Sequence, residues 1–197
     1  MPTAKRLIVL ALLLLLTVPA SAQLDPDPDG IGVYFDPAAT LIASQAFVGE
    51  TVPAYLILTR PSQAGGLALW EAYVGPAGFN AMVRGTPVGG GNMLTTPPGN
   101  LGVSFAVGMD QPYPALQTVT ILAELQISVT DGGPVELLVG GYSYELPFYR
   151  LDDFYHGTEG SMTPSSGSTT LPVAVINGDD PVATDVLSWG GVKALYR

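Results

Sequence analysis

One segment, residues 117–130, constrains the fold more than any other part of the chain. Its sequence is QTVTILAELQISVT, and apolar side chains stand at every second position: Val119, Ile121, Ala123, Leu125, Ile127 and Val129. A period of two and a wealth of β-branched residues are typical of a half-buried strand. At ~3.3 Å per residue the segment would extend about 43 Å, so we expect a bend or bulge near Leu122 and Ala123. Its apolar face requires a second layer to cover it.

Shorter runs with the same alternation follow one another along the chain. We expect strands at 31–35, 51–60, 67–74, 79–84, 101–109, 117–130, 135–139, 142–151 and 171–176. Between them stand most of the 24 glycines and 18 prolines, and the glycine- and proline-rich stretch 85–100 is expected to be loop. Many short strands without an interior helix predict an all-β protein, an antiparallel β-sandwich. The order of the strands leaves immunoglobulin and jelly-roll topologies open.

The first 22 residues have the pattern of a secretory signal peptide. Lys5 and Arg6 precede an apolar run at 7–18, and Ala20-Ser21-Ala22 is a small-x-small cleavage site. We therefore expect a secreted, periplasmic or cell-surface protein whose mature chain begins near Gln23 and has no transmembrane span. A retained signal anchor is the alternative, although the apolar run is short for one.

The mature chain is expected to form one domain with short flanking segments. We divide it into an acidic leader (23–30), the β-sandwich (31–160), a Ser/Thr/Gly-rich loop (161–170), and a final strand with a C-terminal tail (171–197). Leu187, Val192 and Leu195 could line one side of a short helix in that tail. Gly190 and Gly191 weaken such a helix.

Charge and cysteine content narrow the function classes. Lys5 and Arg6 leave with the signal peptide, so five of the seven basic residues remain against all 17 acids, and the net charge is near −12. This charge argues against nucleic acids and anionic lipids as partners, because both require clustered basic residues. An exported chain without cysteine has no disulfides, so a hydrophobic core must stabilise it.

Three stretches resemble cohesin-type modules. They are Val48-Gly49-Glu50-Thr51-Val52, the run GGLALWE at 65–71, and 116–129 followed by Pro134-Val135-Glu136-Leu137. The resemblance covers roughly residues 31–151. It implies a nine-stranded jelly-roll sandwich, related to bacterial carbohydrate-binding modules and found on secreted and cell-surface proteins. Cohesins bind dockerins through one sheet face, and no residue here matches that face well enough to be assigned.

The acidic leader carries a candidate metal site. Asp25, Asp27, Asp29, Gly30 and Asp36 fall at positions 1, 3, 5, 6 and 12 of a calcium-binding loop. No helix can precede Asp25 after cleavage, and residues 31–35 have the pattern of a strand. A solvated acidic leader without a cofactor is the interpretation we favour, with calcium as the alternative.

An aromatic-rich run at 142–155 is the candidate ligand site. Tyr142, Tyr144, Tyr149 and Tyr155 could form a planar strip that stacks on sugar rings, while the same aromatic residues could instead fill the core. We find no catalytic signature: His156 is the sole histidine, and no G-x-S-x-G motif occurs.

The sequence therefore predicts an exported, non-catalytic module for protein–protein interaction or cell-surface structure. A carbohydrate-binding module that uses the 142–155 run is the first alternative. A hydrolase with two carboxylates about 5 to 9 Å apart is the second.

Overall fold

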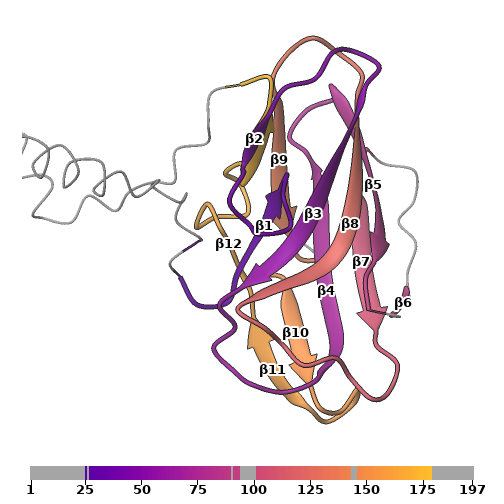
Figure 1. Cartoon of the computed structure of the whole chain (residues 1–197), viewed down its shortest axis with the longest axis vertical. Coiled ribbons are helices and arrows are strands. Elements are labelled where there is room, and N and C mark those ends of the chain that lie inside the picture. The colour runs from indigo at the N-terminus through magenta and orange to yellow at the C-terminus, as the bar shows by residue number, and fades with distance from the viewer. Residues whose placement is uncertain (1–24, 26, 90, 94–100, 143–145, 179–197) are drawn as a thin grey trace, which may run out of the picture.

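The chain folds into a sandwich of two β-sheets (Figure 1). The computed structural model describes residues 25, 27–89, 91–93, 101–142 and 146–178, and it has no helix within them. The first sheet consists, in order, of β12 (Thr163–Pro164), β1 (Gly30–Tyr34), β3 (Thr51–Thr59), β8 (Val119–Val129) and β5 (Ala81–Pro87). The second runs from β11 (Thr158–Ser161) through β10 (Phe148–Leu151), β4 (Leu67–Pro76), β9 (Val135–Gly140) and β13 (Ala174–Ile176) to β2 (Ala43–Ser44). In the same sheet, β4 also pairs with β7 (Val103–Gly108), and β7 pairs in turn with β6 (Asn92–Met93).

The predicted all-β, antiparallel sandwich is confirmed, with two short parallel pairs. These pairs, β1 with β12 and β13 with β2, join late segments of the chain to early ones. The predicted signal peptide and the tail from residue 179 onward lie outside the described residues. Within the described part, no helix has the length and hydrophobicity to cross a bilayer.

β8, which lies within the 117–130 segment, contains the bulge that the length of that segment predicted. Opposite it on β3, Leu56 pairs with Ala123 and Ile57 pairs with Ile121, so Leu122 is an extra residue in β8. Because side chains alternate between faces, one extra residue reverses the alternation. From Ala123 to Val129 the predicted apolar face lies in the core, as expected.

Before the bulge the predicted faces of β8 are wrong. Leu122, expected on the polar side, is in the core with 1% of its surface exposed. Val119 and Ile121 instead lie on the outer face of the first sheet. There they pack on a second apolar cluster formed by Tyr34, Ala39 and Ile57.

The main core fills the space between the sheets. Trp70 on β4 and Phe105 on β7 are fully buried, with ring centroids 5.1 Å apart. Gly85 on β5 lets this pair approach the first sheet, since a Cβ there would lie 2.5 Å from Cζ of Phe105 and 2.8 Å from Cδ2 of Leu125. The absence of a side chain at Gly85 therefore allows the Phe105 ring to pack directly against the backbone of β5.

Several loop boundaries differ from the predicted ones: β12 lies within the predicted loop at 161–170, and two further differences surround β5. β5 begins at Ala81, so Phe79, which the alternation placed in a strand, stands in a turn with 91% of its surface exposed. Residues 85–100 were predicted to be loop, yet β5 continues to Pro87 and β6 follows at Asn92. Pairing with β8 stabilises the extension of β5, and pairing with β7 stabilises β6; no local pattern in the sequence predicts either partner.

Candidate functional site

The outer face of the first sheet carries a shallow groove over β3, β8 and β5. Its volume is about 370 Å³, and its lining includes outward-facing residues from all three strands. Cross-strand pairing arranges them in rows. Tyr55, Glu124 and Thr86 form one row, and Pro53, Gln126 and Arg84 form the next. Directly opposed Cβ atoms in such pairs lie about 5 Å apart, so the six side chains form one continuous patch. We call these six residues the groove patch.

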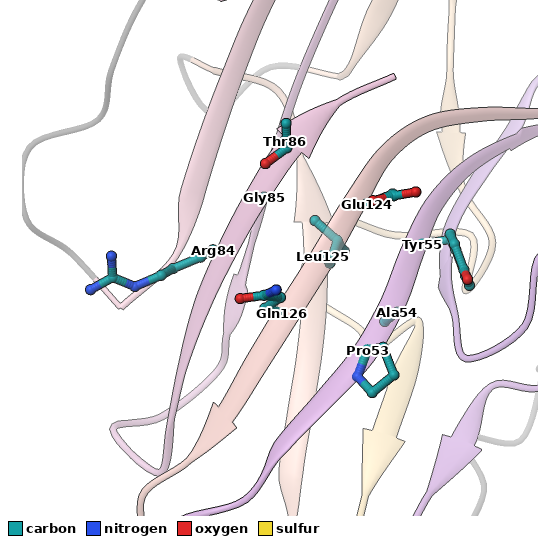
Figure 2. A pocket seen from close by; sticks show the side chains of 9 residues that line it. All are labelled: Pro53, Ala54, Tyr55, Arg84, Gly85, Thr86, Glu124, Leu125 and Gln126. Carbon is teal, nitrogen blue, oxygen red and sulfur yellow. The ribbon is translucent and has the colours of Figure 1, made fainter. Parts of the chain in front are cut away.

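Tyr55 is the best-positioned side chain of the groove patch. It is half-buried, because part of its ring packs on the second apolar cluster beside Ile57. Figure 2 shows Tyr55 and Arg84 on opposite sides of the groove, with Glu124 and Gln126 between them. An aromatic ring held by packing loses little conformational freedom when it contacts a ligand.

The groove patch combines both charges with neutral hydrogen-bonding groups. Arg84 provides a guanidinium, Glu124 a carboxylate, Gln126 an amide and Thr86 a hydroxyl, all of them exposed. Nη2 of Arg84 contacts Sδ of Met82, its neighbour on β5, at 3.7 Å. Such a surface can recognise a partner through hydrogen bonds around an aromatic anchor. It has one carboxylate, whereas glycoside hydrolysis uses two.

A second groove lies at the other end of β3. It measures about 520 Å³ and is lined by Pro28, the β3–β4 loop at 60–64, and residues 116–118. Its lining contains no acid and no histidine. Neither groove therefore brings together the carboxylate pair that the hydrolase alternative requires.

The four predicted ligand-binding tyrosines do not form one exposed strip. Tyr149 pairs with Trp70 across β10 and β4 and is fully buried. Its hydroxyl donates to Oδ1 of Asp29 at 2.8 Å. Burial, and then this bond, raises the pKa of Tyr149 to about 12. Tyr142 and Tyr155 are 45% and 75% exposed, and Tyr144 lies outside the described residues.

The predicted calcium ligands have partners within the protein. Asp29 Oδ1 also accepts the N–H of Ser62 at 2.8 Å, so this carboxylate joins the leader to the β3–β4 loop and to β10. Asp36 accepts the N–H groups of Thr40 and Leu41 at 2.8 and 2.7 Å. Burial alone would raise the pKa of Asp36, but these hydrogen bonds outweigh it and lower the pKa.

Asp25 and Asp27 complete the predicted set. Asp27 donates its N–H to Oδ1 of Asp25 at 3.1 Å, and Asp27 itself is exposed. Burial raises the pKa of Asp25 despite that hydrogen bond. In the described part of the chain, no three acidic or histidine side chains converge closely enough to hold a metal ion.

His156 and its neighbouring acids form a turn. Oδ1 of Asp153 accepts the N–H groups of Tyr155 and His156, both at 2.7 Å, and these bonds lower the pKa of Asp153. The imidazole Nδ1 lies 3.6 Å from the same oxygen, with most of the ring in solvent. Asp152 accepts the N–H of Gly66 at 2.6 Å and so ties this turn to the start of β4.

Sequence reasoning missed the groove patch. The alternation at 51–60 and 117–130 did place Tyr55, Glu124 and Gln126 on the faces opposite the main apolar rows of their strands. It could not show that β5 lies beside β8, so Arg84 and Thr86 had no assigned neighbours. Thr86 pairs with Glu124 across 38 positions of sequence, and Arg84 with Gln126 across 42.

Comparisons with known proteins find likeness in structure alone. No protein-family model matches the chain, and no curated protein does. Among solved structures, it is similar to the second type II cohesin module from the adaptor ScaA scaffoldin of Acetivibrio cellulolyticus, at 12% identity and a TM-score of 0.45 over 80% of this chain and 94% of that one. It is also similar to the seventh ScaB type I cohesin from Pseudobacteroides cellulosolvens (14%, TM-score 0.41, 73% and 94%) and to CaCohA2 from Clostridium acetobutylicum (14%, TM-score 0.42, 75% and 88%).

Cohesin modules, which three stretches of the sequence resemble, are thus among the structures that this chain is similar to. At this identity and TM-score the likeness assigns no binding residue and no role to this chain.

Proposed function

We propose that the chain is an exported, non-catalytic β-sandwich module that binds a protein partner through the groove patch. The observation that carries the proposal is Tyr55, an aromatic anchor set by packing, with Arg84 across the groove. Tyrosine and arginine are enriched among the residues that dominate the binding energy of protein interfaces. A flat antiparallel sheet face also offers a partner many contacts without a deep cleft.

Site-specific photo-crosslinking in the producing organism tests this proposal. A photoreactive residue is placed at Gln126 or Thr86, and a matched control is placed at Glu136, which is exposed on β9 of the other sheet. We expect the two groove positions to crosslink the same discrete protein, and the control not to do so. Identical products from all three positions would contradict the proposal.

Affinity measurements with that captured protein identify the anchors. Arg84→Glu changes an exposed side chain and should leave folding intact, and Tyr55→Ala removes the aromatic ring. Truncation of a dominant interface residue typically costs 2 kcal/mol or more, so we expect binding to weaken by about 30-fold or more for each change. Glu136→Lys is the control for charge.

Glycan binding remains a second candidate because of two exposed rings. Tyr155 and Tyr142 are 75% and 45% exposed, and each ring could stack on a sugar. Retention of the chain on insoluble polysaccharides, and its loss in Tyr155→Ala and Tyr142→Ala, would favour this function. No retention on any polysaccharide tested would remove it.

Export is part of the proposal and has its own test. The basic start at Lys5 and Arg6, the apolar run and the Ala20-Ser21-Ala22 site support cleavage near Gln23. Mass spectrometry of the protein recovered outside the cytoplasm should show a chain beginning at about residue 23. An intact amino-terminal segment in that fraction would favour the retained anchor.

A further inference from the structure

One end of the sandwich presents three exposed apolar side chains. Phe79 is 91% exposed, Phe47 80% and Val48 59%. Phe47 and Val48 belong to the β2–β3 loop and Phe79 to the β4–β5 turn, at the top of Figure 1. We call these three residues the apolar end. Exposed apolar residues that are scattered singly are common, whereas exposed apolar residues that are grouped together are typical of interaction surfaces.

The two loops are attached to consecutive residues at the end of β8. Gly49 donates its N–H to the carbonyl of Val129 at 2.8 Å. The next residue, Thr130, donates its N–H to the carbonyl of Asn80 at 2.9 Å and its hydroxyl to the carbonyl of Phe79 at 3.2 Å. Phe47 and Phe79 are therefore presented on either side of the same short backbone segment.

The β2–β3 loop is also held internally. Glu50 donates its N–H to the carbonyl of Phe47 at 3.0 Å, and its carboxylate accepts the N–H of Phe47 at 2.9 Å. Phe47 is thus exposed on a turn that two hydrogen bonds to Glu50 hold in place.

Acidic residues border the apolar end. Glu50 and Asp131 are both exposed, and they lie in the turns that carry or touch it. A Cβ added at Gly132 would lie 3.8 Å from Cγ2 of Val48, so the 131–133 turn is adjacent to the β2–β3 loop. The apolar end therefore suits a ligand that is apolar and carries positive charge.

The chain leaves the described region at this same end. The side chain of Asn177 is hydrogen-bonded to both backbone groups of Ala46, the residue before Phe47. A Cβ on Gly178 would lie 3.3 Å from Cβ of Pro134. Residues 179–197 follow directly from this point.

The sequence of that segment has the composition that the apolar end requires. It contains Leu187, Trp189, Val192, Leu195 and Tyr196. It also holds Lys193 and Arg197, two of the five basic residues outside the predicted signal peptide, and both follow Trp189, whereas its three acids, Asp179, Asp180 and Asp185, precede it. Trp189 follows Gly178 by eleven residues, a length that can extend about 36 Å. Attachment raises the local concentration of such a segment to the millimolar range, so modest contacts are enough to hold it.

We propose that residues 185–197 of the same chain dock on the apolar end. Trp189 packs against Phe47 and Phe79, and Lys193 and Arg197 face the acidic border of Glu50 and Asp131. This contact is independent of the groove patch, which lies on the outer face of the first sheet. The partner-binding proposal can therefore fail while this one holds, and the reverse is also true.

Tryptophan fluorescence tests the docking directly. The chain has two tryptophans, and Trp70 is fully buried in the core. Acrylamide quenching of the mature chain, with the Trp189→Phe variant as background, therefore reports on Trp189. We expect the quenching constant of Trp189 to rise several-fold in the Phe47→Ser/Phe79→Ser variant. Emission should shift to longer wavelength, as expected for an indole in water.

Two further variants make the test specific. Tyr155→Ser changes a side chain that is also largely exposed, in the turn between β10 and β11, and it should leave the quenching of Trp189 unchanged. Glu50→Lys/Asp131→Lys should raise quenching, because it repels Lys193 and Arg197. Far-UV circular dichroism checks that each variant is folded.

Three results would overturn the proposal. One is equal quenching of Trp189 in the wild type and the Phe47→Ser/Phe79→Ser variant. Another is protection that grows with protein concentration together with a dimer in light scattering, which would assign the apolar end to a second copy. The third is protection of Trp189 that appears only when lipid vesicles are added.

Discussion

The side chain of Asn177 brackets the backbone of Ala46, 131 positions earlier in the chain. Its Nδ2 donates to the Ala46 carbonyl at 2.7 Å, and its Oδ1 accepts the Ala46 N–H at 2.8 Å. Asn177 also has a φ of 60°, a left-handed conformation that asparagine tolerates better than most residues. It lies directly after β13, so it ends the parallel pairing of β13 with β2.

Asn177→Ala should destabilise the fold by about 1–3 kcal/mol. The change removes both hydrogen bonds and places a less tolerant residue at positive φ. Urea denaturation measures the loss as a fall in the midpoint at constant slope. Asn92→Ala is the control: Asn92 is exposed, with one side-chain bond to Asp110, and should change stability by about 0.5 kcal/mol or less. Equal losses of stability in the two variants would show that the two hydrogen bonds between Asn177 and Ala46 do not stabilise the fold.

Gly85→Ala should cost about 1–3 kcal/mol, as expected for an overpacked core. The added Cβ would lie 2.5 Å from Cζ of Phe105 and 2.8 Å from Cδ2 of Leu125, so the Phe105 ring, the Leu125 side chain or β5 itself must move. Gly133→Ala is matched to it, because nothing lies within 4 Å of the added Cβ. Thermal unfolding of both variants checks the prediction. An unchanged stability of the Gly85→Ala variant would show that the packing at Gly85 is not tight enough to exclude a Cβ.

Tyr149→Phe should lower stability by about 1–3 kcal/mol at neutral pH, since it removes a hydrogen bond to the Asp29 carboxylate. The pKa of Tyr149 is raised to about 12 in the fold, so folding favours its neutral form. Its contribution is complete below about pH 10 and is lost as the pH rises toward 12. The stability difference between wild type and variant should therefore shrink over that range. Tyr155→Phe serves as the exposed control.

Asp36→Asn and Asp25→Asn should have opposite pH dependence. The pKa of Asp36 is lowered in the fold, so its carboxylate stabilises the protein above about pH 3.8 and that stabilisation disappears as the pH falls further. Asp36→Asn should therefore be harmful at pH 6 and nearly neutral near pH 3. The pKa of Asp25 is raised, so its ionisation opposes folding. Asp25→Asn should gain stability relative to wild type as the pH rises from 3 to 7. Parallel profiles of melting temperature for the two variants would contradict these assignments.

The strands were predictable because their side chains alternate, which is a local property of the sequence. The position of the bulge near Leu122 also followed from the length of the 117–130 segment alone. The reversal of faces before it did not, because the extra residue is defined only by its register with Leu56 and Ile57 on β3. The same reasoning applies to Tyr149, whose burial is decided by its pairing with Trp70 across the sheet.

The candidate surfaces depended even more on contacts between distant segments. Arg84 and Thr86 join Tyr55 and Glu124 because β5 and β3 both pair with β8. The apolar end exists because the β2–β3 loop and the β4–β5 turn are hydrogen-bonded to Val129 and Thr130, two consecutive residues at the end of β8. No local pattern in the sequence reports such neighbours. For the same reason, the sequence pattern predicts a strand at Phe79, whereas β5 begins at Ala81.

The extra residue at Leu122 divides β8 into two halves whose outward-facing side chains form different surfaces. On the half that follows it, Glu124 and Gln126 reach the groove; on the half that precedes it, Val119 and Ile121 support the cluster beside Tyr55. Both surfaces lie on the same side of one sheet, yet they draw on odd positions in one half and even positions in the other. Deletion of one residue between the two halves would therefore exchange the inner and outer faces for every residue of β8 on one side of the deletion.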